Sequence, residues 1–525
     1  MESQTSDRRT IIRNAGIVGA STVASRVLGL LRDAVLASML GASFWADAFF
    51  VAFRIPNLSR QLLGEGALSA SFVPVYTDVL RKRGEESARG FSNHLYSLLV
   101  LILTLLTLAG ILFAPGLVRI IALGFDPDSD VFTTTVLLTR WMLPYMIFVC
   151  AAALGMGILN SRGHFLTPAL APALLNLSII FFALLVAPSL PMPVVGVAWG
   201  VLVGGILQLL IQYPPMRAMK VTPALGIPSL TPEVRRVGIM MGPAILGVTV
   251  YQLNILVDTV LASFLPTGSI TYLWYGNRMM QFPLGVFGIA LATAALPTMS
   301  RQVSEGRRED FWKTVSFSLG LTAFIGFPAA LGLIALREPI MAALFGRGAF
   351  GAADVAGAGQ ALFFYSLGLP FFIGIKILGR AFFARENTRI PFAAAGLAFL
   401  VNAVLDVVLM GPLGHAGLAL ATSIASAFNF LFLAGSFTRR EGAGWMDGDL
   451  LKESARAMAA ALVMFTVVWA AARGFAWMEL STLQRVGGLF GCMGLGFGVY
   501  FGAALALGCK GLKTLKNRYF SRRAR

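Results

Sequence analysis

Long apolar runs recur along the whole chain and are separated by short polar segments. Each run holds roughly 18 to 25 residues, which is the length of an α-helix that crosses the hydrocarbon core of a bilayer. A core helix of a water-soluble domain would be shorter or would keep a polar face. The pattern therefore predicts an all-α polytopic membrane protein.

The apolar runs predict about fourteen transmembrane helices. The second run is unusually long, and we expect it to bend or break around residues 64–66 and Pro74. The predicted spans are 15–41, 44–80, 92–123, 131–159, 165–187, 194–219, 236–265, 269–299, 312–336, 356–384, 390–410, 415–437, 452–473 and 485–509.

Basic residues gather in alternate connections between the predicted spans. The other connections are short and nearly uncharged, or acidic as at 126–130, and only the connection 337–347 is mixed. Basic loops stay on the cytoplasmic side, so we expect an even number of spans and two cytoplasmic termini. Much of the net charge of +17 therefore sets topology and is not a nucleic-acid footprint. The basic connections are 81–89, 162, 217–236, 301–308, 385–389 and 439–440, together with both ends of the chain.

The two halves of the chain resemble each other. Two repeats of about six spans that point the same way are related by a pseudo-two-fold axis along the membrane normal, a common plan for transporters. We therefore expect an N-terminal lobe at 1–220, a C-terminal lobe at 221–440, and a region at 441–525 with spans thirteen and fourteen and a basic cytoplasmic tail. The recurring features include Val35–Ser38 with Val260–Ser263, Leu143-Pro144 with Leu369-Pro370, and Pro168 and Asn176 with Pro391 and Asn402.

Composition excludes several classes of protein. Hydrophobic residues make up 57% of the chain and charged residues only 13%, about half of the charged fraction of a soluble domain. The three cysteines show no paired spacing and the three histidines are scattered, so neither a disulfide framework nor a zinc site is expected. The sequence has no P-loop, no histidine metal motif and no serine elbow. We therefore expect a transporter and not an enzyme.

Several charged residues fall inside the predicted spans, where each costs roughly 2.5–3.5 kcal/mol on insertion scales. Arginines outnumber carboxylates among them, so complete pairing is impossible and a positively charged cavity remains. Arginine stays charged when desolvated and binds phosphate oxygens in pairs, which favours an anionic substrate. The polar residues are Arg26, Arg32 and Asp33 in span one, Asp47, Arg54, Asn57, Arg60 and Glu65 in span two, and Asn277 and Arg278 in span eight.

Some of these residues also allow a structural interpretation. Arg32 stands next to Asp33, and Arg60 stands five residues before Glu65, so each arginine could pair locally or extend to the membrane interface. Asp47 follows the first outer connection and could face periplasmic water. Arg26 and Arg278 have no obvious partner nearby in the sequence, which makes them the leading candidates for binding an anion.

A second polar set belongs to the other half of the chain. Asn402 and Asp406 are four residues apart and lie on one face of span eleven. Asp258 falls in span seven and Thr422 in span twelve. Their oxygens are hard ligands that suit a small cation such as Na⁺. A cluster of hydrogen bonds between packed helices explains them equally well, and both interpretations remain open.

Six motifs resemble the MurJ (MviN) family of lipid II flippases, within the multidrug/oligosaccharidyl-lipid/polysaccharide (MOP) exporter superfamily. The resemblance covers nearly the whole chain, and its first two motifs are the most specific. The motifs are SRVLGLLRD at 25–33, DAFFVAFRIPNL at 47–58, EGALS at 65–69, FVP at 72–74, MGPAILG at 241–247 and GHAGL at 414–418.

The resemblance implies a flippase that moves lipid II, an undecaprenyl-diphosphate-linked peptidoglycan precursor, from the inner to the outer leaflet of the bacterial inner membrane by alternating access. It also implies that spans thirteen and fourteen form a groove for the lipid tail, that no cofactor is required and that cell-wall synthesis enzymes are partners. The family's essential cavity residues match Arg26, Arg32, Asp47, Asn57, Arg60, Glu65 and Arg278. Positions that bind sodium in some relatives match Asp258, Asn402, Asp406 and Thr422.

One departure from the family pattern lies in span eight. Asn277 and Gln281 stand where many relatives carry acids, which makes the cavity more positive. Three alternatives remain open: a flippase for another polyprenyl-diphosphate-linked glycan of the O-antigen type, a cation-coupled drug exporter, and a membrane enzyme that acts on the same lipid. The arginine excess argues against the drug exporter, because a cationic substrate needs the opposite balance of charge.

Overall fold

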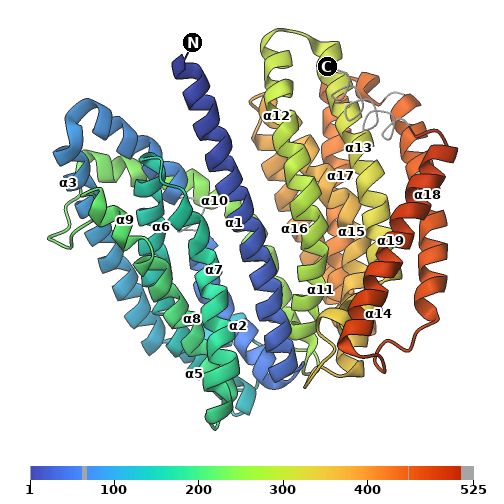
Figure 1. Cartoon of the computed structure of the whole chain (residues 1–525), viewed down its shortest axis with the longest axis horizontal. Helices are drawn as coiled ribbons and strands as arrows, with labels where there is room; N and C mark the ends of the chain where they lie inside the picture. The colour runs from blue at the N-terminus through green and yellow to red at the C-terminus, as the bar shows by residue number, and fades with distance from the viewer. Residues whose placement is uncertain (1, 62–67, 447, 510–525) are drawn as a thin grey trace. The chain divides into compact units, whose positions relative to one another are not determined.

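The computed structural model describes residues 2–61, 68–446 and 448–509, and the chain divides into two compact units, Met1–Thr267 and Gly268–Arg525. Helices are the only regular secondary structure in these described ranges (Figure 1). The predicted all-α class is therefore confirmed.

The first unit contains the helices of the first six predicted spans and of the seventh. They are α1 (Glu2–Leu40), α2 (Phe44–Ser59), α3 (Ser69–Leu112), α4 (Ala114–Ile121), α5 (Asp130–Met142), α6 (Tyr145–Ser161), α7 (Leu166–Phe181), η2 (Phe182–Val186), η3 (Ala187–Ser189), α8 (Pro193–Leu210), α9 (Tyr213–Ala218) and α10 (Pro232–Ala262).

The second unit contains the remaining spans. Its helices are α11 (Ser269–Pro283), η4 (Leu284–Gly288), α12 (Ile289–Ser304), α13 (Arg308–Ala335), α14 (Arg337–Leu344), α15 (Ala352–Ala384), α16 (Arg389–Leu413), α17 (His415–Glu441), η5 (Ala443–Trp445), α18 (Gly448–Arg473) and α19 (Thr482–Ala506).

The helices of each unit pack against one another as follows. In the first unit, α1 lies along α7, α7 packs on α8, α6 packs on α3 and α8, and α10 packs on α3 and α4 (Figure 1). In the second unit, α15 is central and contacts α11, α12, α13, α14 and α17. The last two helices also belong to this unit, since α18 packs on α13 and α19 packs on α18 and α14.

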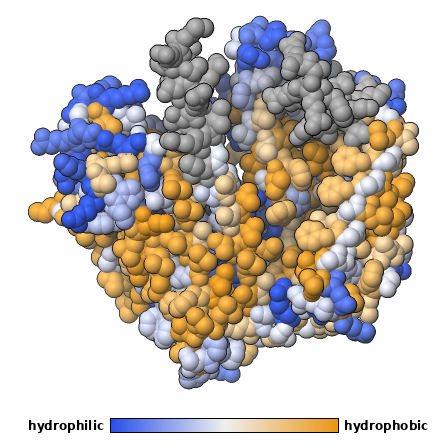
Figure 2. Space-filling model, in the orientation of Figure 1, coloured by the Kyte–Doolittle hydropathy of each residue, from blue (hydrophilic) through white to orange (hydrophobic). Residues whose placement is uncertain are grey.

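The outer surfaces of the helices are apolar, as a lipid-facing surface requires. Large hydrophobic side chains such as Leu112, Leu185, Val404 and Phe490 are more than 60% exposed. Figure 2 shows hydrophobic side chains over the middle of the helices on this face of each unit, with hydrophilic side chains gathered toward the helix ends. Exposed apolar area on this scale marks a surface that meets lipid rather than water.

Eleven helices in the described residues are long and apolar enough to cross a membrane. They correspond to all of the predicted spans except one, two and seven, which are α1, α2 and α10. Helix α1 carries Arg26, Arg32 and Asp33, and α2 carries Asp47 and Arg54 and has only 16 residues. The predicted count of about fourteen spans stays a prediction.

The bend or break expected around residues 64–66 lies outside the described residues; α2 ends at Ser59 and α3 begins at Ser69. Pro74 lies inside α3. A break interrupts α3 at Gly84, whose φ of 80° favours glycine. It separates the predicted spans two and three, which lie before and after it in α3.

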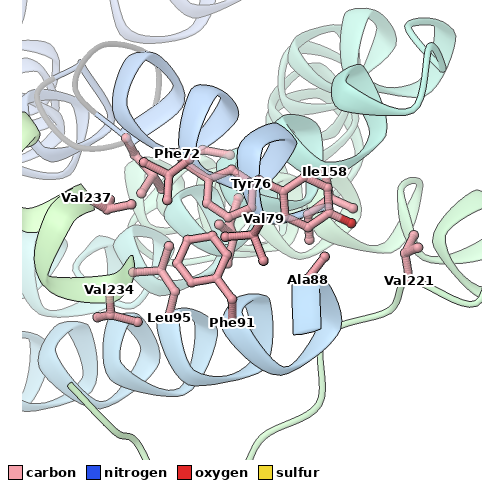
Figure 3. Close-up of a cluster of buried hydrophobic side chains, with 14 of the residues drawn as sticks. Phe72, Tyr76, Val79, Ala88, Phe91, Leu95, Ile158, Val221, Val234 and Val237 are labelled. Carbon is pink, nitrogen blue, oxygen red and sulfur yellow. The ribbon is translucent and has the colours of Figure 1, made fainter. Parts of the chain in front are cut away.

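A buried hydrophobic cluster holds this bent helix together. Phe72, Tyr76 and Val79 come from α3 before Gly84, and Phe91 and Leu95 come from α3 after it (Figure 3). Side chains of α6 and α10 complete the cluster, among them Ile158, Val234 and Val237. The cluster explains why α10 packs with the first unit although the repeat assigns 221–262 to the second lobe. The division at 220 and 440 describes the repeats and stays a prediction.

Candidate functional site

Arg32 and Asp33 form a buried ion pair in α1. The Nε and Nη2 atoms of Arg32 lie 3.0 and 2.6 Å from Oδ1 of Asp33, and the two residues are only 9% and 0% exposed. Nη1 of Arg32 donates to Oδ1 of Asn176 in α7 at 3.2 Å. The local pairing that the sequence offered as one interpretation of Arg32 is thus present, together with a hydrogen bond to Asn176, which the sequence identified only as part of the repeat.

Arg26 lies in a different environment on the same helix. It is exposed, whereas Arg32 is buried. Arg26 stands seven residues before Asp33, which is close to two helical turns, so the two residues lie on one face of α1. A long cationic side chain that is exposed in the middle of an apolar helix needs water or an anion around it.

Of the predicted site residues of the second span, Asp47, Arg54 and Asn57 lie on α2 and Arg60 follows its last residue. Asp47 is buried in the first turn, where the helix dipole favours a negative charge, and Arg54 is half-buried. Nε and Nη2 of Arg60 donate to Oδ1 of Asn57 at 3.0 and 2.9 Å. Arg60 and Asn57 are therefore brought together, while Glu65 lies outside the described residues.

Arg278 lies on α11 in the second unit and is half-buried. Its neighbour Asn277 accepts a hydrogen bond from the amide of Gln281 one turn later. The two residues that depart from the expected family pattern thus form a neutral amide pair. Arg278 therefore has two neutral amides near it on its own helix. Carboxylates at these positions would lower the local positive charge, and the amides do not.

The predicted cation ligands divide between the units. Nδ2 of Asn402 donates to Oδ2 of Asp406 at 2.6 Å on α16, and both side chains are buried. Thr422 lies on α17, the helix that α16 packs against, and its hydroxyl donates to the carbonyl of Leu418. Asp258 lies on α10 in the first unit. The carboxylate, amide and hydroxyl oxygens of this set have the chemistry that a small hard cation requires.

The described residues hold no group of three or more histidine, cysteine, aspartate or glutamate side chains that could bind a metal ion. A transition-metal centre would need such a group. The candidate set has two carboxylates, an amide and a hydroxyl, so the sodium assignment stays a prediction.

Ion pairs that the sequence analysis did not foresee join the segments at one end of the first unit. Arg162, after α6, donates to both carboxylate oxygens of Glu85, with Nη1 at 2.6 Å from Oε1, and its Nη2 also donates to the hydroxyl of Tyr76. Arg83 pairs with Glu233 at the start of α10. The hydrogen bond from Arg162 holds the pKa of Glu85 below its ordinary value. These pairs connect both sides of the Gly84 break to α10 and to the turn after α6.

Arg485 at the start of α19 is a second unforeseen contact, in the other unit. Its guanidinium donates to the carbonyls of Met478 and Leu480 at 2.6 and 2.9 Å and to the carbonyl of Gly346 after α14. Backbone carbonyls leave no signature in a sequence, so no pattern could have found these partners. The contacts fasten α19 to the end of α14.

Comparison with known proteins decides the family. The family model described as lipid II flippase MurJ matches residues 36–487. A "Probable lipid II flippase MurJ" from Vibrio cholerae serotype O1 is 36% identical over 523 residues, with 97% of this chain and 98% of the relative covered. The chain belongs to the lipid II flippase MurJ family. A "Lipid II flippase MurJ" from Burkholderia cenocepacia is 34% identical, again with 97% of this chain and 98% of the relative covered.

Solved structures agree with the MurJ family. The chain matches the structure titled "Lipid II flippase MurJ, inward closed conformation" with a TM-score of 0.76 and 26% identity, covering 97% of this chain and 99% of that one. An inward-facing MATE family transporter of the MOP superfamily matches with a TM-score of 0.68 at 16% identity over 81% of this chain and 96% of that one, which shows a shared fold alone. The matched MurJ model begins at residue 36, so Arg26 and Arg32 precede it.

Proposed function

We propose that this protein is a lipid II flippase of the bacterial inner membrane, a transporter that moves its lipid across the bilayer without changing it chemically. The observation that carries the proposal is the match to MurJ relatives over 97% of the chain at 34–36% identity. The apolar surface of its helices supports a multi-pass membrane protein. The basic connections between helices favour two cytoplasmic termini.

Positive charge provides the chemistry for binding the diphosphate of lipid II. Arg26 and Arg278 are the ligands that we propose for the phosphate oxygens, with Arg54 and Arg60 assisting, because a guanidinium keeps its charge in an apolar site and bonds two oxygens at once. Asp47 and Glu65 would exchange partners among these arginines as the protein changes state. Arg32 was also predicted as a ligand, which stays a prediction, and its guanidinium forms a buried ion pair with Asp33.

Alternating access would come from motion of two bodies, and the chain divides into two compact units. A membrane potential that is negative inside contributes about 2.3 kcal/mol per exported negative charge per 100 mV, which would favour outward movement of a diphosphate. We further propose that Asp258, Asn402, Asp406 and Thr422 bind Na⁺, supported by their oxygen chemistry. Cell-wall synthesis enzymes that consume lipid II are the partners that this function requires.

A depletion experiment tests the substrate. A bacterial strain depleted of its own lipid II flippase should regain growth when it expresses this chain, and withdrawal of the chain should cause lysis with accumulation of lipid II. Loss of surface polysaccharide alone, without lysis, would instead indicate a different polyprenyl-diphosphate glycan.

The same strain tests the arginines. Arg26→Ala and Arg278→Ala should abolish growth at normal protein levels, because each removes a cation that binds the diphosphate. Arg217→Ala is the matched control, since Arg217 is an exposed arginine in the last turn of α9, where the basic connection 217–236 begins. Full activity of either cavity variant would contradict the role that we propose for it.

A further inference from the structure

The chain between α9 and α10 runs without helix through residues 221–231, with the sequence VTPALGIPSLT. Pro223 and Pro228 explain this, because a proline has no amide hydrogen and disfavours helical backbone in the residue before it. The backbone donors of the segment therefore need partners outside a helix.

The segment is fastened to the first unit at both ends and in its middle. Val221 and Val234, on either side of it, belong to the hydrophobic cluster around the Gly84 break (Figure 3). Between them, the amide of Ala224 donates to Oδ1 of Asn93 at 2.8 Å, and the amide of Gly226 donates to Oγ of Ser97 at 3.0 Å. Asn93 and Ser97 lie on α3, so the segment lies across this helix in a defined position.

Three large apolar side chains of the segment point away from the protein. Leu225, Ile227 and Leu230 are 67%, 89% and 75% exposed. Residues two apart in an extended chain share a face, which accounts for Leu225 and Ile227. A single exposed apolar side chain is ordinary, but several held together on a fixed backbone mark a surface that meets another apolar phase.

The hydrogen bonds to α3 show at which depth of the membrane this surface lies. Arg89 is the last arginine, lysine or carboxylate residue of α3, and the long apolar run of the helix begins at Leu98. Asn93 and Ser97 follow Arg89 by about 6 and 12 Å along the helix axis, at roughly 1.5 Å per residue. The segment therefore crosses α3 where the headgroups give way to acyl chains, the zone into which interfacial apolar side chains insert.

Basic side chains stand at both ends of the segment. Lys220 precedes it and Arg235 follows it, and both are exposed. Their neighbour Arg236 pairs with Asp78, whereas no carboxylate in the described ranges pairs with Lys220 or Arg235. Basic residues beside a membrane are attracted to anionic headgroups, most strongly on the cytoplasmic face, and this connection is one of those expected in the cytoplasm.

We propose that residues 221–231 are an anchor in the cytoplasmic membrane interface. The three exposed side chains of the segment insert between the headgroups and the acyl chains, and Lys220 and Arg235 bind the headgroups of anionic phospholipids. Lipid fits this surface better than a partner protein does, because exposed leucines such as Leu101 and Leu105 continue along the same helix toward the membrane interior. The anchor goes beyond the proposed function and does not depend on which lipid the protein moves.

Depth-dependent quenching of fluorescence tests the anchor in the full-length protein. Ile227→Cys carries an environment-sensitive fluorophore, and the three native cysteines are buried and should not compete for the label. The protein is reconstituted in nanodiscs of phosphatidylcholine and phosphatidylglycerol. Glu86→Cys is the matched control, because Glu86 is exposed on the same helix as Asn93 but lies on the water side of Arg89.

The label at Ile227→Cys should be quenched several-fold more strongly by lipids with a nitroxide near the headgroup than the label at Glu86→Cys, and less by aqueous iodide. Quenching by iodide alone would place the segment in water and overturn the anchor. Protection from both quenchers would overturn it in favour of a contact with protein. Leu225→Cys repeats the measurement at a second exposed position if Ile227→Cys fails to fold.

The same label tests the headgroup preference. Lipid quenching at Ile227→Cys should be stronger with phosphatidylglycerol than in phosphatidylcholine alone, and the added substitutions Lys220→Gln and Arg235→Gln should abolish that difference. Lys452→Gln, at an exposed lysine of α18, should preserve it. A difference that persists without Lys220 and Arg235 would overturn their role. Because no transport is measured, failure of the anchor and failure of the proposed function are distinguishable.

Discussion

The side-chain amide of Asn176 donates a hydrogen bond of 3.1 Å to the backbone carbonyl of Ser25, and so joins α7 to α1 at the residue before Arg26. Because the same amide also accepts a hydrogen bond from Arg32, one side chain of α7 makes two hydrogen bonds to α1. The position of the exposed Arg26 therefore depends on a residue that has no charge and lies on another helix.

Asn176→Ala should lower the stability of the protein by about 1–3 kcal/mol, since it leaves the Arg32 guanidinium with one acceptor fewer in a buried place. Thermal unfolding of the full-length protein measures the effect. Asn160→Ala, which removes an asparagine from the end of α6, is the control and should change stability less. Equal effects of the two substitutions would show that the amide of Asn176 has no special role.

Gly124→Ala should destabilise the first unit strongly. A Cβ at Gly124 would lie 2.4 Å from the backbone N of Phe264 and the backbone C of Ser263, just after α10. The amide of Gly124 also donates to Oγ of Ser263 at 2.8 Å. Because backbone atoms cannot move aside as a flexible side chain can, we expect a loss of about 1–3 kcal/mol or more.

Gly116→Ala is the matched control for this substitution, because a Cβ at Gly116 meets no atom within 4 Å. Alanine is also the better helix former at this position in α4. We expect Gly116→Ala to leave the unfolding temperature unchanged or to raise it. A Gly124→Ala protein as stable as the Gly116→Ala protein would contradict the close approach of the α4–α5 loop to the end of α10.

The ion pair between Arg162 and Glu85 should weaken in acid. The pKa of Glu85 is held below its ordinary value by the hydrogen bond from Arg162, so the stabilisation is present at neutral pH, above the ordinary glutamate pKa of about 4.3. It is lost as the pH falls through the lowered pKa and the carboxylate is protonated.

Amide hydrogen exchange of residues 160–166 measures this link. After correction for the intrinsic pH dependence of exchange, protection should fall in acid in the unsubstituted protein and should be lower at every pH in Glu85→Gln. Glu86→Gln is the control, because Glu86 is an exposed neighbour on the same turn. A pH response that persists in Glu85→Gln would assign the effect to another group.

Sodium should stabilise the protein through Asp406 if the proposed cation set is right. Replacing choline with sodium should raise the unfolding temperature of the unsubstituted protein, and Asp406→Asn should remove that rise because the ion loses a charged ligand. Asp128→Asn, in the exposed loop before α5, should keep it. A sodium response that survives in Asp406→Asn would exclude Asp406 as a ligand.

The apolar runs predicted the fold class well, because the length of a membrane-spanning helix is set by the bilayer and can be counted in one sequence. The signal of a span is weaker in α1, whose polar residues lower its mean hydropathy, and in α2, which is only 16 residues long. The sequence predicted only in part that Arg32 is buried and paired while Arg26 is exposed. Asp33 is adjacent in sequence, but Asn176 is 144 positions away.

Long-range partners explain the rest of what the sequence could not predict. Arg162 meets Glu85 across 77 positions, and Arg485 meets only backbone carbonyls. Side chains of α10 join the hydrophobic cluster around the Gly84 break, and such packing between distant segments cannot be read from a repeat.

The most direct test of the central claim is reconstitution of the purified protein in liposomes that carry lipid II in both leaflets, with a probe that reports how much lipid II each leaflet exposes. The protein should move chemically unchanged lipid II between leaflets, and Arg26→Ala at equal protein density should not. Absence of movement, chemical change of the lipid, or movement by Arg26→Ala at the unsubstituted rate would contradict a flippase that holds its substrate by this arginine.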